Sequence, residues 1–283
     1  MNSLPLEFVF NMVVTLNTII ENKRHEVEKS KIEVPLAKLK QLVDPSISPR
    51  NFFGSVVNGH TTNSTSVIAE IKRKSPSAGV LCENFDPISI AKSYENAGAA
   101  AISCLTDENF FGGHLSYIKD IKAHVSLPVL RKDFIIDDYQ IWESRAAGAD
   151  AILFIAEILS EGQLVDYLIL AQSLGMTSLV ESHDLDNLII TQQYTKFPHA
   201  GYNLLGINNR NLKTMKTDLS HTIRMVDVVE DASIIVSESG IKSPEDLDKL
   251  RANGIHIVLV GESLMKDKNP GKALAKLIRM NPT

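Results

Sequence analysis

The sequence predicts an α/β protein with the architecture of a (β/α)8 TIM barrel that carries extra N-terminal helices. Eight short apolar runs recur along the chain at near-regular intervals, as buried parallel strands covered by helices do. Each run ends abruptly in polar or charged residues, which suits a barrel whose chemistry lies at the carboxyl ends of its strands. The length of 283 residues fits one barrel domain.

The predicted elements follow in order from residue 16. Residues 16–43 are typical of an amphipathic helix followed by a second short helix after Pro35, and Phe52-Phe53 opens another. The sequence does not decide whether these helices close the bottom of the barrel or lie over its top. The eight predicted strands are residues 67–69, 100–105, 128–130, 151–155, 178–180, 204–207, 234–236 and 257–260.

Helix start and stop signals separate these strands. The predicted N-terminal signals are Asp86-Pro87, Asp137 or Asp138, Ser160, and Ser243-Pro244. The predicted C-terminal signals are Gly98, Gly148, Gly175 and Gly254, which short connections to the next strand require.

We expect one ordered domain. Residues 1–15 are predicted to be an extension outside it, with translation from Met12 as an alternative start. Residues 16–283 are predicted to form a single barrel domain whose helical extension reaches about residue 66. The first twenty residues lack a basic segment and a cleavage pattern, so no signal peptide is predicted. The sequence contains no uninterrupted apolar run of about 18 residues, so no membrane helix is predicted.

Composition limits the partners. A net charge of −5 and a pI near 5.9 do not favour nucleic-acid or membrane binding, so an anionic ligand would need a local basic cluster. Cys82 and Cys104 show neither a disulfide framework nor metal-ligand spacing. We therefore expect a reducing, cytoplasmic compartment and no metal.

The first predicted strand ends in a charged pair. Strand alternation places Glu70 and Lys72 on one side, where an acid and an amine can tune each other's pKa and share proton transfer. A stabilising ion pair at the rim is the alternative, but the basic residues that follow favour a site. The connection over residues 72–86 is long, and we predict a mobile lid there.

Two further strands end in candidate acid–base residues. Lys132 points opposite to Arg131 and Asp133, and a lysine beside the barrel axis is hard to explain by packing. It is a candidate general acid, unless it is simply solvated at the rim. Glu181 is a candidate general base. His183 follows it and is interpreted as a structural residue of the next turn.

The last three strands end in candidate anion-binding segments. Asn208 and Arg210 offer fixed donors for a carboxylate or a sugar hydroxyl, although Asn-rich exits are also common turns. Ser239-Gly240 and Gly261-Glu262 follow the seventh and eighth strands, whose loops often bind phosphate through backbone N–H groups.

With these residues assigned, the chain closely resembles the indole-3-glycerol phosphate synthase family. The matching motifs are EIKRKSPS at 70–77, LTDENFFGG at 105–113, PVLRKDFIID at 128–137, ESHD at 181–184, GINNRNL at 206–212, SESGI at 237–241 and VGESLM at 260–265. They span most of the chain from about residue 16 onward, and the set as a whole is highly specific.

The resemblance implies a reaction and its catalytic residues. The substrate would be 1-(2-carboxyphenylamino)-1-deoxyribulose 5-phosphate, closed to indole-3-glycerol phosphate with loss of CO2 and water and without a metal or organic cofactor. Lys132 would be the general acid and Glu181 the base. Lys72 would bind the substrate carboxylate or act as a second acid, positioned by Glu70. Asn208 would steer the substrate carboxylate and sugar.

The resemblance also implies binding residues and partners. The substrate-binding residues would be Ser75, Phe110, Phe134, Arg210 and Leu212, with Phe110, Phe134 and Leu212 walling the aromatic ring. The phosphate contacts, largely through backbone, would come from Ser239, Gly240, Gly261 and Glu262. We expect a small phosphosugar partner, no nucleic acid, no membrane, and a monomer or weak oligomer that contacts other tryptophan-pathway enzymes.

Two alternative hypotheses compete with the synthase function. Phosphoribosylanthranilate isomerase, on a related barrel, relies on a Cys and Asp pair with the Cys at the end of the first strand, where this chain has Glu70 and Lys72. A non-catalytic phosphosugar-binding barrel would not need Lys72, Lys132 and Glu181 to converge. The fold alone would not distinguish these functions.

Overall fold

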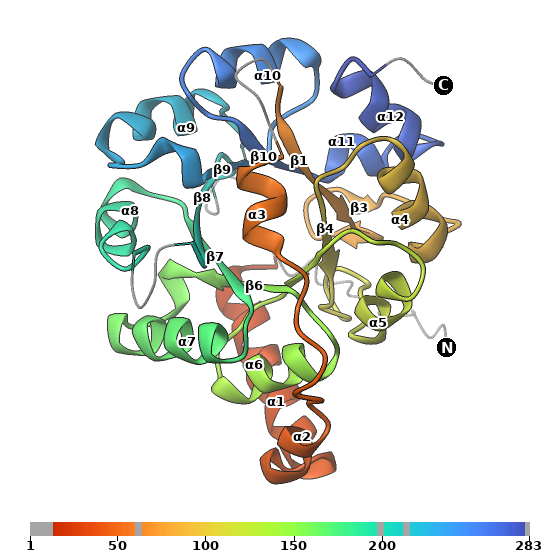
Figure 1. The fold of residues 1–283 in the computed structure, drawn as a ribbon, viewed down its shortest axis with the longest axis vertical. Coiled ribbons are helices and arrows are strands. Elements are labelled where there is room, and N and C mark those ends of the chain that lie inside the picture. Colours follow the sequence, from red (N-terminus) through yellow and green to blue (C-terminus); the bar gives the residue numbers. More distant parts are fainter. Residues whose placement is uncertain (1–13, 60–63, 197–200, 212–215, 281–283) are drawn as a thin grey trace, which may run out of the picture.

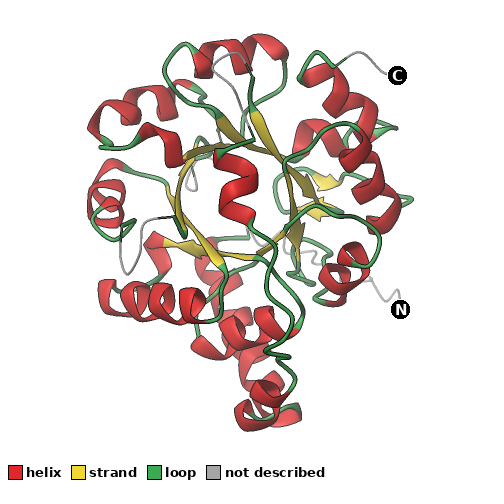
Figure 2. Ribbon diagram, in the orientation of Figure 1, coloured by secondary structure: helices red, strands yellow, loops and turns green. Residues whose placement is uncertain are grey.

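Eight parallel strands close into a barrel in the computed structural model, which describes residues 14–59, 64–196, 201–211 and 216–280 (Figures 1 and 2). Each strand pairs with the next barrel strand along the chain, and β10 returns to β1. The strands are β1 Ser66–Ile71, β4 Ala101–Leu105, β5 Val129–Lys132, β6 Ala151–Ile155, β7 Thr177–Ser182, β8 Asn203–Asn208, β9 Ile235–Glu238 and β10 Ile257–Val260. Each overlaps one predicted run, so the predicted fold class is confirmed.

Helices surround the barrel (Figure 1). The outer helices are α4 Pro87–Asn96, α5 Ser116–Lys122, α6 Asp138–Ala146, α7 Glu161–Ser173, α8 Leu185–Gln192, α9 Ser220–Met225, α10 Pro244–Arg251, α11 Glu262–Met265 and α12 Pro270–Leu277. Short 3-10 helices are η1 Ala156–Ile158, η2 Val226–Val228 and η3 Ala232–Ile234.

The predicted helix starts are confirmed. Asp86 and Asp137 accept hydrogen bonds from backbone N–H groups in the first turns of α4 and α6. Ser160 and Ser243 form capping boxes with the residues three positions on. These caps satisfy N–H groups that a helix leaves without intrahelical partners, and they fix where each connection ends.

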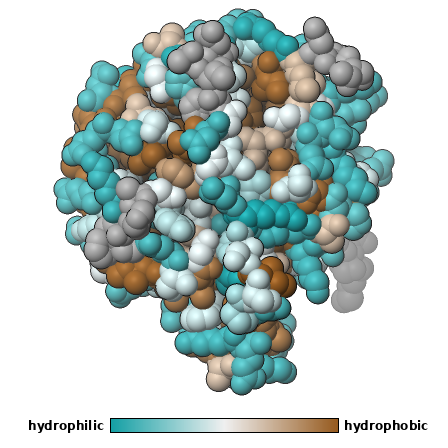
Figure 3. All heavy atoms as spheres, viewed as in Figure 1, coloured by the Kyte–Doolittle hydropathy of each residue, from teal (hydrophilic) through white to brown (hydrophobic). Residues whose placement is uncertain are grey.

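The bottom of the barrel is closed by α3 (Phe52–Val57), which crosses the opening in Figure 1. Phe52 and Val56 are fully buried and pack on inward-facing residues near the amino ends of strands, such as Ala101 and Ala151. Around α3, hydrophilic and hydrophobic residues are interspersed on this face (Figure 3). One of the predicted N-terminal helices therefore closes the bottom.

The other two N-terminal helices lie against the side of the barrel, and the first of them reaches the top. α1 (Leu16–Glu33) and α2 (Leu36–Gln41) pack on α6 through a cluster of Val27, Leu39 and Tyr139. The Tyr139 hydroxyl is 3.0 and 2.9 Å from the carbonyl oxygens of Ser30 and Val34. Thr15 caps α1, and residues 1–13 of the predicted extension lie outside the described residues.

α1 is fastened to the top of the barrel by a buried lysine. Lys23 Nζ lies 3.0 Å from Asp107 Oδ2 and 2.9 Å from Asp133 Oδ1, and its side chain is 5% exposed. Burial opposes its charge, but the two carboxylates outweigh burial and raise the pKa of Lys23. Asp133 also pairs with Arg131 at 3.1 Å on the outer side of β5, as strand alternation predicts.

Among the described residues, none of the helices combines the length and apolar character needed to cross a membrane.

Replacing Lys23 by Met should lower the free energy of unfolding by about 3–5 kcal/mol, because two buried carboxylates would lose their cation. Lys29→Met is the matched control on the same helix, since its ion pair with Glu33 is exposed. Urea unfolding measures both. Equal stability of the two variants would contradict an anchoring role for Lys23.

Candidate active site

A cavity of about 670 Å³ opens at the carboxyl ends of the strands, opposite α3. Side chains following most barrel strands line it, together with Leu16 and Ile19 of α1. The polar residues Glu70, Lys132, Glu181 and Glu238 have the inward parity of the apolar residues deeper in their strands. The strands therefore hold these charges over the packed interior.

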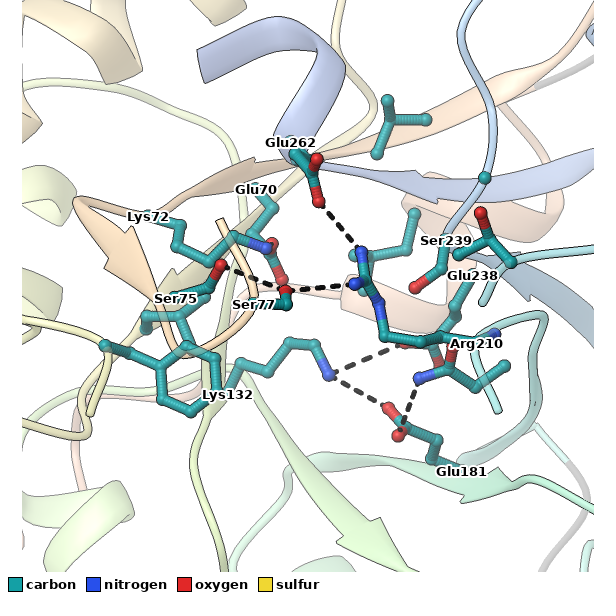
Figure 4. A pocket seen from close by; sticks show the side chains of 18 of the residues that line it. Glu70, Lys72, Ser75, Ser77, Lys132, Glu181, Arg210, Glu238, Ser239 and Glu262 are labelled. Atoms are coloured by element: carbon teal, nitrogen blue, oxygen red, sulfur yellow. Dashed lines mark hydrogen bonds and ion pairs between the residues drawn. The ribbon is translucent and has the colours of Figure 1, made fainter. Parts of the chain in front are cut away.

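The centre of the cavity is a lysine held by two glutamates (Figure 4). Lys132 Nζ lies 2.9 Å from Glu181 Oε2 and 3.5 Å from Glu238 Oε2. The Lys132 side chain is 16% exposed, and both carboxylates are buried. Burial alone would lower the pKa of Lys132, but these carboxylates, Glu181 first, outweigh burial and raise it. Lys132 is therefore a firmly protonated donor.

The pKa values of the two glutamates shift in opposite directions. Burial would raise the pKa of Glu181, but Lys132 and His183 outweigh it and hold the pKa well below its usual range. Burial and the charge of Glu181 raise the pKa of Glu238. The pKa values of Glu181 and Glu238 are therefore shifted apart, because two adjacent buried carboxyl groups do not both ionise easily and titrate as a pair.

Asn208 completes the surroundings of Glu181. Its Nδ2 donates to Glu181 Oε1 at 3.0 Å, while Lys132 holds the other carboxylate oxygen. The strand register places Glu181 opposite Gly206, and a Cβ at Gly206 would collide with Glu238 Oε1. Gly206 thus leaves the space in which the two carboxyl groups meet.

The charged pair predicted after the first strand is present. Lys72 Nζ lies 2.5 Å from Glu70 Oε1, and Glu70 is buried. A Cβ at Gly261 would collide with Glu70 Oε1. Gly261 therefore makes room for the carboxylate that holds Lys72 at the cavity.

Arg210 and Glu262 pair across the cavity mouth. Arg210 Nη2 lies 2.8 Å from Glu262 Oε2, and Nη1 donates to Ser77 Oγ at 3.0 Å (Figure 4). Lys266 lies 2.7 Å from the other oxygen of Glu262. Lys266 and Arg210 lower the pKa of Glu262, which is therefore an anion with two cationic partners.

The predicted lid contains a small hairpin over the cavity. β2 (Lys74–Ser75) pairs antiparallel with β3 (Gly79–Val80), and Ser75, Pro76 and Ser77 line the cavity. Lys74 Nζ donates to the Asn109 carbonyl at 2.8 Å. Ser77 of the hairpin contacts Arg210, which follows β8, three strands away from β1 in the barrel, so the hairpin lies over the cavity mouth.

The two predicted phosphate segments meet at one wall. Ser239 and Gly240 have φ values of 66° and 82°, and a left-handed serine is strained backbone of the kind found at ligand sites. Asn209 Nδ2 donates to the Ser239 carbonyl at 3.1 Å and fixes this turn. Gly261 and Glu262 begin the facing segment, and both segments line the cavity.

The predicted aromatic wall is only partly placed at the cavity. Phe134 lines it, and so does Phe111, with the two ring centroids 5.9 Å apart. Phe110, the residue chosen from the sequence, is not among the lining residues, because the turn set by Asp107 presents its neighbour instead. Leu212 lies outside the described residues.

His183 lies in the turn between β7 and α8, as predicted, but the sequence did not predict that its ring has fixed partners. Its Nε2 lies 3.3 Å from Glu181 Oε1 and its Nδ1 3.1 Å from Glu157 Oε2. Glu238 was not assigned either, although its inward parity with Val236 was a usable signal. Glu157 and Phe111 carried no signal, because the backbone path after a strand is not a periodic pattern.

Among the described residues, no group of three or more His, Cys, Asp or Glu side chains is arranged to hold a metal ion. Lys72, Lys132, Arg210 and Lys266 instead supply the local positive charge that an anionic ligand needs in an acidic protein.

The barrel and its charged cavity define a (β/α)8-barrel enzyme, and comparison with known proteins narrows this class. Residues 16–277 match the family model for indole-3-glycerol phosphate synthase. The chain is 40% identical over 267 residues to the indole-3-glycerol phosphate synthase of Carboxydothermus hydrogenoformans, covering 93% of this chain and 99% of that protein. The chain therefore belongs to the indole-3-glycerol phosphate synthase family, and it is a carboxy-lyase of tryptophan biosynthesis.

Solved structures share the fold at low sequence identity. The 3-hexulose-6-phosphate synthase of Salmonella typhimurium matches with a TM-score of 0.59 and 15% identity, over 76% of this chain and 97% of that chain. The tryptophan synthase alpha subunit of Legionella pneumophila matches with a TM-score of 0.56 and 16% identity, over 81% of this chain and 96% of that chain. These similarities support the barrel fold alone.

Gly261→Ala should displace the Glu70 carboxylate and break its contact with Lys72, so we expect kcat/KM to fall at least about tenfold while the fold persists. Gly162→Ala is the matched control, because a Cβ there meets no atom within 4 Å. Steady-state kinetics and circular dichroism give the readouts. If Gly261→Ala had wild-type kinetics, the reaction would not depend on the present position of the Glu70 carboxylate.

Proposed function

We propose that the chain closes 1-(2-carboxyphenylamino)-1-deoxyribulose 5-phosphate to indole-3-glycerol phosphate, with loss of CO2 and water. The observation that carries the proposal is the convergence of Lys132, Glu181 and Lys72 on one cavity that also holds two candidate phosphate turns. A phosphosugar that carries a carboxylate needs two cationic regions separated by an apolar wall, and Phe111 and Phe134 supply that wall.

The ring-closing step assigns the acid role to Lys132. The aromatic carbon that bears the carboxylate attacks the ketone carbon, and negative charge develops on the ketone oxygen. The raised pKa of Lys132 disfavours protonation of the neutral ketone, but transfer becomes favourable as the more basic alkoxide forms. Loss of CO2 then restores the aromatic ring.

Dehydration assigns the base role to Glu181. Water leaves from the former ketone carbon, and the neighbouring methylene loses a proton to make the indole double bond. Glu181 is an ionised carboxylate at the cavity floor, held by Asn208 and Lys132, and it accepts this proton. Lys72 protonates the leaving hydroxyl or binds the substrate carboxylate, with Glu70 positioning it.

Substrate binding uses the rest of the cavity mouth. Asn208 and Arg210 steer the carboxylate and the sugar, and Ser75 contributes from the hairpin. The phosphate is bound largely by backbone N–H groups of Ser239, Gly240, Gly261 and Glu262. The Glu262 carboxylate is turned to Arg210 and Lys266, which supports a backbone role there.

The alternative isomerase function needs an acid–base Cys at the end of the first strand, where this chain has Glu70 and Lys72. Cys104 lies in β4 within the layer between barrel and helices, and burial raises the pKa of this thiol to about 12. We further propose a cytoplasmic location, which the two free cysteines of the described residues support. We also propose a monomer or weak oligomer that contacts other enzymes of the pathway.

Purified wild type should convert the carboxyphenylamino-deoxyribulose phosphate to a fluorescent indole, and Lys132→Ala should lose at least about 100-fold in kcat, because the general acid is gone. Lys119→Ala, an exposed lysine of α5, is the control. No turnover by a folded wild type that binds the substrate would favour a non-catalytic barrel. Equal turnover by wild type and Lys132→Ala would assign the acid role elsewhere.

Amide hydrogen exchange across residues 72–86 should slow when a phosphate- and carboxylate-bearing substrate analogue binds, because the hairpin would close on the ligand. Exchange in α7 should stay constant and serves as the internal reference. Unchanged exchange in residues 72–86 at saturating analogue would mean that this segment is not a lid.

A further inference from the structure

The imidazole of His183 lies between two carboxylates. Its side chain is 8% exposed at the cavity wall, just after β7. Nδ1 is 3.1 Å from Glu157 Oε2, and Nε2 is 3.3 Å from Glu181 Oε1. The contact between Nε2 and Glu181 Oε1 has the distance of an ion pair but not the alignment of a hydrogen bond. Nε2 is buried, and the group next to it is the base of the proposed reaction.

Glu157 holds the ring by two independent contacts. It lies in η1 after β6, and its Oε1 accepts the backbone N–H of His183 at 2.7 Å while Oε2 faces Nδ1. The two oxygens of one carboxylate therefore fix both the backbone and the ring of the same residue. If His183 only filled space, a single contact with Glu157 would be enough to hold it. The two contacts together fix the orientation of the ring as well as its position.

The charges around the ring favour a protonated imidazole. Burial opposes the charge and so does Lys132, but Glu157 and Glu181 outweigh them and raise the pKa of His183. From α9, His221 Nε2 contacts the His183 carbonyl at 3.0 Å and holds the segment from the other side.

We propose that Glu157 and His183 form a positioning dyad for Glu181, in which Glu157 fixes the ring with a proton on Nδ1 and the ring holds its charge beside Glu181 Oε1 at ion-pair distance. This inference rests on the proposed function, since it deepens the role given there to Glu181. The Glu157 carboxylate, the His183 imidazolium and the Glu181 carboxylate lie in a row in space. The dyad therefore favours the ionised form of Glu181 and fixes its orientation toward the substrate.

The dyad predicts a direction for the pH profile. An imidazolium near Glu181 favours its carboxylate form, so removing that charge raises the pKa of Glu181. Because a base must be ionised to act, the acid limb of kcat/KM then moves to higher pH. The affinity for substrate changes little, because neither Glu157 nor His183 is needed to bind it.

The experiment compares Glu157→Gln and His183→Gln with wild type. We expect kcat to fall about tenfold in both, KM to change less than about twofold, and the acid limb to rise by about one pH unit. Glu157→Gln keeps size and the contact with the His183 backbone, so it tests the charge without a folding defect. Glu161→Gln and His124→Gln, both exposed, are the matched controls.

A nuclear magnetic resonance titration of the histidine rings gives a readout independent of turnover. His183, assigned by the signal lost in His183→Gln, should titrate above its ordinary pKa of about 6.5 in wild type and lower in Glu157→Gln. An unshifted His183, or one unaffected by Glu157→Gln, overturns the dyad. So does an acid limb unchanged in both variants of an active enzyme. An inactive wild type would instead reject the proposed function, while the titration would still decide the dyad.

Discussion

The ammonium of Lys132, held between Glu181 and Glu238 at the top of a packed barrel, is the interaction on which the site depends. Taking a charge out of water is unfavourable unless it is compensated at close range, and here two glutamates at 2.9 and 3.5 Å from Lys132 Nζ provide that compensation. The arrangement raises the pKa values of Lys132 and Glu238 and lowers the pKa of Glu181. The same set of contacts therefore shifts the pKa values of all three groups.

The backbone makes room for this balance at two glycines. Gly206 lies in β8 and Gly261 follows β10, and each lacks the Cβ that would collide with a carboxylate of the site. Their role is a close approach rather than an unusual turn, because neither has a positive φ. The site thus depends on absent side chains as much as on charged ones.

The same principle of compensated burial organises the periphery. Lys23 carries α1 onto Asp107 and Asp133, so the helix that lines the cavity with Leu16 and Ile19 is fixed by charge as well as packing. Asp107 also accepts the N–H groups of Phe110 and Phe111, and so directs the aromatic wall. A stability element and a binding element therefore share one carboxylate.

The sequence by itself determined the barrel, its strand order of appearance, the capped helix starts and the inward parity of Glu70, Lys132 and Glu181, because these follow from local periodicity. Only the tertiary structure decided that Phe111 rather than Phe110 faces the cavity, that His183 has two carboxylate partners, and that α3 closes the bottom while α1 reaches the top. These outcomes depend on loop paths and on contacts between distant strands. The alternation of side chains ends where the strand ends. The orientation of a side chain one or two positions further on therefore depends on contacts with residues that are distant in the sequence.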